Sequence, residues 1–327
     1  MSELRKDPIL GRWVIISKER GKRPIDFEII AASVKSDYCP FCPGNEESTP
    51  PEIYKISGEN NGWSLRVIPN KFPVLHVEGN LERKGEGIYD LLNGIGAHEV
   101  IIETNVHDEK MENYNQPHLE NIIKTYRSRI LDLKNDNRLK YAIIFKNHGA
   151  DAGASLEHAH SQLVALPIVP QIINEELGGS KKYFDFKERC IFCDIIDQEL
   201  VQQKRIVLEN EYFIALEPYA ARFPFETWIL PKKHESNFEM LENSRIPNLA
   251  NLLLNTLKKL KIALNDASYN LVIHSAPFAD EFMPYYHWHI EIIPKVSQVA
   301  GFEWGTGFYI NPTSPEEAAE FLQNITL

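Results

Sequence analysis

Three polar side chains, His158, His160 and Gln162, alternate along one segment of the sequence. Because successive side chains of a β-strand point to opposite faces, an extended segment would place all three on one face. A loop of small residues with Gly149 and Gly153 precedes the segment. Glycines let backbone N–H groups approach a phosphate closely, since no Cβ stands in the way. The pattern indicates a phosphate-handling site with a histidine nucleophile, but a metal-binding histidine pair or ordinary strand histidines fit the spacing equally well.

The four cysteines form two C-x-x-C pairs, Cys39 with Cys42 and Cys190 with Cys193. In a reducing compartment such pairs indicate metal binding or redox chemistry rather than structural disulfides. A thioredoxin-like redox motif would need a βαβ context, which neither pair has. Metal binding is therefore the favoured interpretation, and buried cysteines that pack as small hydrophobic residues are the alternative.

The second half of the chain repeats the plan of the first. In each half a C-x-x-C pair is followed by an apolar run that ends at a histidine, so that residues 98–107 match residues 225–234. Each half then reaches a His-x-His segment, at 158–160 and at 287–289. Two copies of one unit explain the length of the chain better than two unrelated domains.

Each copy also predicts an amphipathic helix, over 117–134 and over 246–264, from apolar residues at helical spacing. We therefore expect an α+β fold in which each copy is an antiparallel sheet with packed helices. The polar stretch 178–182 interrupts the pattern, and we place the domain boundary near it, with domains 1–175 and 176–327.

The repeat yields two equivalent sets of possible metal ligands. Two cysteines and two histidines are ligands of many tetrahedral zinc sites, and four protein ligands leave no position for a reactive water. Both zinc ions would therefore be structural. If His158 binds zinc, His160 is left without a metal. The predicted sets are Cys39, Cys42, His107 and His158 in the first half and Cys190, Cys193, His234 and His287 in the second.

The pattern Asn-x-Gly-x-x-x-Gly-x-Ser-x-x-His-x-His-x-Gln, from Asn147 to Gln162, resembles the active-site motif of the galactose-1-phosphate uridylyltransferase family, a branch of the histidine-triad superfamily. Further matches run from Gly11 to Glu303, so the resemblance covers nearly the whole chain. Ala159 departs from it, because well-known members carry proline there. The resemblance implies two histidine-triad-like repeats, supports the first zinc site by position, leaves the second variable, and implies a homodimer.

The resemblance also implies roles for individual positions. Arginines near the N-terminus would bind the phosphate and nucleotide, an asparagine turn would contact the ribose and base, and a C-terminal segment would contact the sugar, often in the neighbouring subunit. The positions expected to bind substrate are Arg20, Arg23, Asn70, Asn147, Gly153, Ser155 and Ser161, together with Gly301, Phe302 and Thr306 of the C-terminal segment.

We expect His160 to attack the α-phosphorus of a nucleotide sugar, because a neutral imidazole with a pKa of about 6.5 is a nucleophile at neutral pH. A sugar 1-phosphate would leave, and a second phosphate-bearing acceptor would take the nucleotide from His160, which predicts ping-pong kinetics. Gln162 and Ser161 would donate hydrogen bonds to the α-phosphoryl oxygens. His289 is the counterpart of His160, but Glu291 replaces Gln162, and a carboxylate would repel phosphate, so His289 is predicted to be non-catalytic. Ordinary surface or core positions are expected for His76, His98, His118 and His274.

Substrate choice depends on the C-terminal segment 301–312. It departs from the Tyr-Glu pair of familiar galactose enzymes and resembles a sister group that includes an ADP-glucose phosphorylase. The leading expectation is a uridylyltransferase that exchanges UMP between UDP-glucose and a hexose 1-phosphate such as galactose 1-phosphate. One alternative is an adenylyltransferase that moves AMP from ADP-glucose to inorganic phosphate through the same histidine. The other is a zinc-stabilised module that binds nucleotides without turnover.

Composition narrows the class of protein further. A net charge of −11 argues against a partner such as duplex nucleic acid, which needs a basic face. The chain has no apolar run of about 18 residues, as a membrane helix requires, and residues 1–6 lack the apolar core of a signal peptide. We expect a cytoplasmic enzyme whose partners are a nucleotide sugar and a sugar 1-phosphate.

Overall fold

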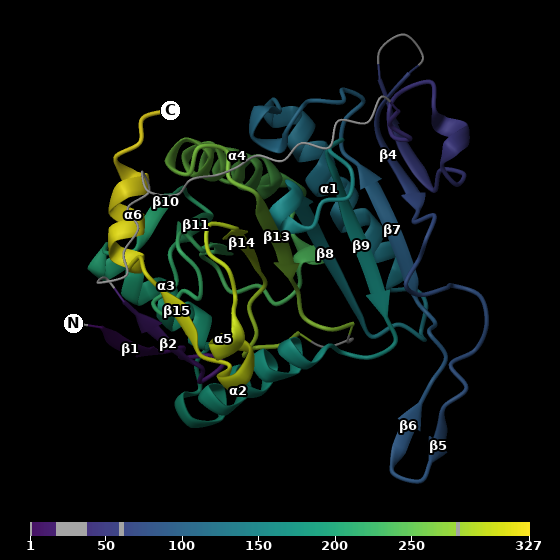
Figure 1. The fold of residues 1–327 in the computed structure, drawn as a ribbon. Helices are drawn as coiled ribbons and strands as arrows, with labels where there is room; N and C mark the ends of the chain where they lie inside the picture. The colour runs from purple at the N-terminus through teal and green to yellow at the C-terminus, as the bar shows by residue number, and fades with distance from the viewer. Residues whose placement is uncertain (1, 18–37, 59–61, 279–281) are drawn as a thin grey trace.

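The computed structural model describes residues 2–17, 38–58, 62–278 and 282–327 of the chain. A ten-stranded sheet, antiparallel at each pairing, runs through the middle of the molecule (Figure 1). The first half of the chain supplies β3 (Tyr54–Ser57), β4 (Trp63–Pro69), β7 (Ala97–Ile102), β8 (Tyr141–His148) and β9 (His160–Leu166). The second half supplies β10 (Ile206–Glu209), β11 (Phe213–Leu216), β12 (Thr227–Pro231), β13 (Tyr269–His274) and β14 (His289–Pro294).

The two halves contribute their strands in the same order. Outward from the centre, the first half runs β8-β9-β7-β4-β3 and the second runs β13-β14-β12-β11-β10. β8 and β13 pair at the centre, where Phe145 lies opposite Val272. The predicted α+β fold with two repeated units is therefore confirmed, and the two units share one continuous sheet.

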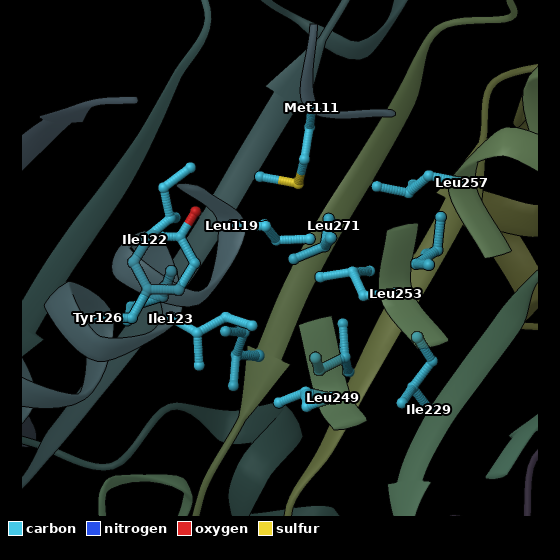
Figure 2. Packing of buried hydrophobic residues seen from close by; sticks show 14 of the residues in the cluster. Met111, Leu119, Ile122, Ile123, Tyr126, Ile229, Leu249, Leu253, Leu257 and Leu271 are labelled. Carbon is cyan, nitrogen blue, oxygen red and sulfur yellow. The ribbon is translucent and has the colours of Figure 1, made fainter. Parts of the chain in front are cut away.

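Two long helices cover one face of this sheet. They are α1 (Gln116–Leu133) and α4 (Ile246–Ala263), which match the two predicted amphipathic helices. α1 starts where it does because the Asn115 side chain accepts a hydrogen bond from the backbone N–H of His118, which caps an otherwise unpaired donor. The apolar faces of the helices meet over β13 (Figure 2). The buried residues labelled there include Leu119, Ile122 and Ile123 of α1, Leu249, Leu253 and Leu257 of α4, and Leu271 of β13.

The opposite face of the second half is covered by α3 (Ile191–Gln202), which packs Phe192 against Trp228 and Leu216 of the sheet. α2 (Gln171–Lys187) precedes it and includes the polar residues 178–182 within one continuous helix. Gly179 lets α2 pack closely against the backbone of Ile9, because a Cβ at position 179 would lie 1.9 Å from the Ile9 carbonyl oxygen. The domain boundary after residue 175 stays a prediction.

The remaining elements lie around this sheet. β1 (Glu3–Lys6), β2 (Trp13–Ile16) and β15 (Tyr309–Asn311) form a small sheet, and the hairpin of β5 (Lys84–Glu86) and β6 (Tyr89–Leu91) projects from the first half (Figure 1). α5 (Gly301–Thr306) precedes β15, and α6 (Pro315–Gln323) starts at the capping box of Ser314. Single 3-10 turns are η3 (Glu46–Ser48), η5 (Met111–Asn113), η6 (Ala150–Ala152), η7 (Phe238–Met240) and η8 (Asn243–Arg245). Among the described helices, none has the length and apolar character needed to cross a bilayer.

Candidate active site and metal centres

His160 is the first residue of β9, and its side chain is almost completely buried. Its Nδ1 lies 2.8 Å from the backbone carbonyl oxygen of His158. A carbonyl can only accept, so Nδ1 carries the proton and Nε2 carries the lone pair. No described residue forms a hydrogen bond with Nε2. Burial, reinforced by the Lys146 ammonium, lowers the pKa of His160, which favours the neutral ring that a nucleophile needs.

The first predicted metal set comes together beside this ring. The ligand atoms of Cys39, Cys42, His107 and His158 all lie within 4.8 Å of one another. Nδ1 of His158 is 3.6 Å from both sulfur atoms, and Nδ1 of His107 is 3.3 Å from the Cys42 sulfur. The other ring nitrogen of His158 donates a hydrogen bond to the carbonyl of Thr104 at 2.8 Å. A ligand histidine held in this way is typical of metal sites.

The second predicted set has the same arrangement. Cys190, Cys193, His234 and His287 also place their ligand atoms within 4.8 Å of one another. The Cys193 sulfur is 3.5 Å from Nδ1 of His234 and 3.7 Å from Nδ1 of His287. His287 donates from Nε2 to the carbonyl of Pro231 at 2.8 Å. In each set the histidines turn Nδ1 toward the cysteines, and Nε2 of the first histidine of the His-x-His segment is bound to a backbone carbonyl.

These distances can be compared with what a tetrahedral zinc ion requires. Zn–S bonds of about 2.3 Å and Zn–N bonds of about 2.1 Å separate sulfur and nitrogen by about 3.6 Å. The observed separations run from 3.3 to 3.7 Å. These separations suit a four-coordinate metal, and both predicted ligand sets are brought together.

Phe41, inside the first C-x-x-C pair, packs against both histidines of the motif. Its ring centroid lies 5.4 Å from that of His160 and 6.1 Å from that of His158, each at an edge-on angle. The cysteine loop therefore holds the metal cluster and also fixes the orientation of the candidate nucleophile.

Gln162 lies two residues beyond His160 on β9, and its Oε1 is 2.9 Å from Nε2 of His98 on β7. Asn70 follows β4 and also approaches His98, with Nδ2 3.1 Å from the same ring nitrogen. Two predicted site residues from different strands thus meet at one imidazole. His98 was expected to be an ordinary histidine, and its position here was not indicated by the sequence.

The glycine loop lies between β8 and β9. Gly149 and Gly153 have φ angles of +81° and +84°, which other residues adopt only with strain. Asn270 of the second half donates from Nδ2 to the Asn147 side chain at 2.8 Å and to the Ala152 carbonyl at 2.9 Å. The predicted residues Asn147 and Gly153 are therefore braced by the other repeat, while Ser155 is exposed at the end of the loop.

Ser161 does not fit its predicted contact with phosphate. Its hydroxyl is buried on the face of β9 opposite His160, where it donates to Glu103 and lies 2.5 Å from the Tyr126 hydroxyl. The physical reason is the strand period, which turns residue 161 toward α1 rather than toward His160 and Gln162. Lys146 completes this buried group, because its Nζ donates to Glu103 at 2.8 Å and to the His160 carbonyl at 3.2 Å.

Other predicted substrate positions lie elsewhere. Arg20 and Arg23 fall outside the described residues. Gly301, Phe302 and Thr306 lie on α5, and the Thr306 hydroxyl donates to the Phe302 carbonyl. Within the described part of the chain, no hydrogen bond or ion pair links α5 to His160 or Gln162.

The second repeat does not reproduce the candidate nucleophile site. His289 is buried and its ring stacks on His274, with centroids 4.7 Å apart. Glu291, at the place of Gln162, forms an ion pair with Arg222 at 2.7 Å. The groups around His289 therefore differ from those around His160, and the non-catalytic role of His289 stays a prediction.

The fold, with a histidine at the start of a strand after a glycine loop, indicates a class, the nucleotidyltransferases. Comparison with known families identifies the particular one. The model described as "Galactose-1-phosphate uridyl transferase, N-terminal domain" matches residues 1–170, and one described as "Domain of unknown function (DUF4921)" matches residues 96–325. The chain belongs to the galactose-1-phosphate uridylyltransferase family, as the sequence motif predicted.

Individual relatives match over almost the full length. The chain is 38% identical to an ADP-glucose phosphorylase of Arabidopsis thaliana, over 99% of this chain and 93% of that protein. It is 33% identical to a galactose-1-phosphate uridylyltransferase of Thermotoga maritima, over 99% of this chain and 98% of that protein. A crystal structure of an ADP-glucose phosphorylase from Arabidopsis thaliana with bound ADP-glucose superimposes with a TM-score of 0.86, at 37% identity and full coverage of both chains.

Proposed function

We propose that the protein transfers a nucleotidyl group from a nucleotide sugar to a phosphate-bearing acceptor through a covalent bond to His160. The observation that carries this proposal is the fixed tautomer of His160, with Nδ1 donating to the His158 carbonyl at 2.8 Å. This contact leaves the lone pair on Nε2, which no described residue binds, so Nε2 is the attacking atom. His158 differs, because both its ring nitrogens are engaged.

The reaction has two displacements at phosphorus. In the first, Nε2 forms a bond to the α-phosphorus while the bond from that phosphorus to the bridging oxygen breaks. The leaving sugar 1-phosphate is a stable anion and needs no proton. In the second, an oxygen of the acceptor phosphate attacks the nucleotidyl-His160, and the N–P bond breaks to restore the imidazole. Such transfers depend on positioning and charge stabilisation more than on acid–base catalysis.

The surrounding residues supply that positioning. Gln162 lies on the same face as His160 and can donate to an α-phosphoryl oxygen. In the glycine loop the N–H groups of Ala152, Gly153 and Ala154 already donate to carbonyls of the loop, so Ser155 is the loop residue proposed to contact phosphate. Asn70 is the proposed contact for the ribose and base. Arg20 and Arg23, outside the described residues, are proposed phosphate ligands because guanidinium groups bind phosphate in a bidentate way.

Zinc is the metal we propose for both Cys₂His₂ clusters. Bound there, it would be structural, since four protein ligands leave no coordination position for substrate. Cys39, Cys42 and His107 would hold it against His158 and so fix the start of β9. The second cluster, with its ligands on α3 and near β12 and β14, would do the same for the other repeat.

Two nucleotide sugars are candidate donors. UDP-glucose with a hexose 1-phosphate acceptor, such as galactose 1-phosphate, is supported by the family to which the chain belongs. ADP-glucose with inorganic phosphate as acceptor is supported by the 38% identity to an ADP-glucose phosphorylase. The same histidine chemistry serves both, so the choice lies in base and acceptor recognition.

Trapping tests the proposal and the donor together. The protein is mixed with UDP-glucose or ADP-glucose, each radiolabelled in the nucleotide, without acceptor, and the acid-labile label on protein is counted. The proposal predicts label from one donor and its release by the matching acceptor. Binding of both nucleotides without label would contradict it and favour a non-catalytic binding module.

We further propose a cytoplasmic homodimer. Two pairs of free cysteines that lie beside histidines suit a compartment that keeps thiols reduced. Phe302 on α5 is exposed, and among the described residues no hydrogen bond or ion pair joins α5 to His160 or Gln162, which suits a tail that serves a second subunit. Light scattering of the purified protein measures the oligomeric state directly.

A further inference from the structure

His98 connects three separate segments around the proposed nucleophile site. It lies on β7, nine-tenths buried, diagonally across from Gln162 on the neighbouring strand β9. Its Nε2 is 2.9 Å from Gln162 Oε1, and its Nδ1 is 3.2 Å from the backbone nitrogen of Val74. Its own carbonyl accepts a hydrogen bond from the backbone N–H of Asn70 at 2.8 Å.

The backbone contact settles which ring nitrogen carries the proton. A backbone N–H can only donate, so Nδ1 of His98 must accept from Val74 and Nε2 must be protonated. Nε2 therefore donates to Gln162, and the Gln162 oxygen faces the ring. The Asn70 amide nitrogen at 3.1 Å cannot donate to a protonated Nε2, so that approach is a packing contact rather than a hydrogen bond.

This tautomer fixes the orientation of the Gln162 amide. An amide has an accepting end and a donating end, and it can rotate by half a turn to exchange them. With its oxygen bound to His98, Gln162 must present its NH₂ group to the remaining space on the face of His160. Only the NH₂ end can stabilise a phosphoryl oxygen, because the carbonyl end would repel it.

We infer that His98 is a positioning residue that holds the Gln162 amide with its donating end toward the α-phosphoryl group. The inference rests on the proposed function, since it assumes that Gln162 faces a phosphate. Because the backbone N–H of Val74 sets the tautomer of His98, the segment that follows Asn70 also helps to orient Gln162.

The second repeat lacks this pair. Trp228 lies opposite Glu291 as Val100 lies opposite Gln162, so two residues earlier Glu226 stands at the place of His98, and Glu291 stands at the place of Gln162. Two carboxylates cannot form the same hydrogen bond, and Arg222 donates to both instead. The His–Gln pair therefore occurs in the repeat that has the candidate nucleophile and not in the other repeat.

A double-mutant cycle tests the inference. The rate of nucleotidyl labelling is measured in a single turnover for the wild type, His98→Leu, Gln162→Ala and the double variant. His98→Leu should slow labelling about 10-fold, less than the about 10²-fold effect of removing a preorganised donor outright. In the Gln162→Ala background, His98→Leu should change the rate less than about 2-fold, because the group that it positions is gone. An equal loss in both backgrounds, or no loss in either, would overturn the inference.

Two further variants separate positioning from folding. His98→Gln keeps an NH₂ donor at about the place of Nε2 and should recover most of the rate, while His76→Leu, at an exposed histidine nearby in sequence, should leave it unchanged. If His98→Gln is as slow as His98→Leu although thermal unfolding is the same, the inference is wrong. Thermal unfolding and zinc content of each variant exclude a loss of structure.

The tautomer can be read without any activity. Nitrogen-15 NMR of the histidine-labelled protein should show His98 neutral with the proton on Nε2. A proton on Nδ1 would overturn the inference even if labelling occurs. If the wild type shows this tautomer but takes no label from either donor, the proposed function fails, and with it the inferred purpose of the contact.

Discussion

The two repeats share the same backbone arrangement and cysteine–histidine cluster but differ in the side chains around the second histidine of the His-x-His segment. In each, the second histidine of the His-x-His segment donates from Nδ1 to the carbonyl two residues earlier, at 2.8 Å for His160 and 3.1 Å for His289. In each, a phenylalanine of the C-x-x-C pair packs on that ring, Phe41 at 5.4 Å and Phe192 at 5.3 Å. The backbone and the metal cluster are thus duplicated almost unchanged.

What differs is the space in front of the ring. His289 is enclosed by Trp228 and His274, with centroids 5.2 and 4.7 Å away, and its neighbour Glu291 is paired with Arg222. Burial and the nearby His274 lower the pKa of His289 to about 4. Around His160 no described residue binds Nε2, Phe41 packs against the ring, and the uncharged Gln162 stands where the second repeat has Glu291. The comparison shows that the two repeats set the direction of an imidazole in the same way and surround it with different groups.

The largest expected effect comes from exchanging each imidazole in turn. His160→Asn should lower the rate of nucleotidyl labelling by about 10⁴-fold or more, as expected for loss of a nucleophile. His289→Asn should leave that rate within about 2-fold, because no substrate reaches its ring. Zinc content should stay the same in both, as measured by atomic absorption. A loss of zinc in His160→Asn would mean that the roles of His158 and His160 are reversed.

Removing one ligand from each metal cluster should separate stability from catalysis. Cys42→Ala and Cys193→Ala should each lose one zinc ion per chain and several kcal/mol of unfolding free energy, a part of the roughly 10–16 kcal/mol that structural zinc supplies in small peptides. Only Cys42→Ala should also slow labelling of the folded protein, because its cluster adjoins the nucleophile. Denaturant titration, metal analysis and labelling are compared at one temperature. Equal labelling rates in the two variants would contradict a link between the first cluster and His160.

Exchanging the two residues that follow the histidines should produce opposite defects. Gln162→Glu places a carboxylate beside the phosphate and should slow labelling about 10²-fold with little change in stability. Glu291→Gln removes one of the two buried carboxylates that pair with Arg222 and with His274, which keep Glu226 and Glu176, and should cost about 1–3 kcal/mol of unfolding free energy, with labelling unchanged in the folded protein. Urea titration and single-turnover labelling distinguish the two. If both variants lose only stability, the positions of Gln162 and Glu291 are not functionally different.

The smallest effect is a pH dependence that belongs to the second repeat alone. Burial alone would lower the pKa of His274, but the carboxylates of Glu176 and Glu291 outweigh this effect and raise the pKa to about 9. His289 stacks on the His274 ring, Arg222 binds Glu291, and Tyr286 binds Glu176. A raised histidine pKa stabilises the fold fully below the unfolded value of 6.5, and this contribution is lost as pH rises through about 9. The loss amounts to on the order of 3 kcal/mol.

The control for this prediction is His274→Gln, which removes the titrating group. The free energy of unfolding of the wild type, measured by urea between pH 6.5 and 9.5, should fall more steeply than that of the variant. Parallel curves would show that His274 is neutral in the folded protein.

Much of this organisation could be predicted from the sequence, because it depends on local periodicity and on the internal repeat. The helices, both ligand sets and the His-x-His strand could be predicted because the same residue spacing occurs in each half of the sequence. The glycine loop followed from its composition. Ser161 was misassigned although the strand period alone would have turned it away from His160.

The contacts between strands distant in sequence could not be predicted. His98 meets Gln162 because β7 pairs with β9 in a register that places Val100 opposite Gln162, and no local pattern encodes that register. Asn270 braces the glycine loop only because β13 pairs with β8 across the two repeats. The buried pair of Lys146 and Glu103 beneath β9 has the same origin. Once the strand order and register are known, each of these three contacts follows from the residues that lie opposite one another in the paired strands.

The central claim is that two histidines two residues apart have different partners, metal for the first and phosphorus for the second. Tandem mass spectrometry of the peptide that contains both, taken from protein trapped with its nucleotide sugar, tests this most directly. We predict one nucleotidyl group on residue 160, with residue 158 unmodified and no modification on the peptide that contains residue 289. A nucleotidyl group on His158, or on any residue other than His160, would contradict the account.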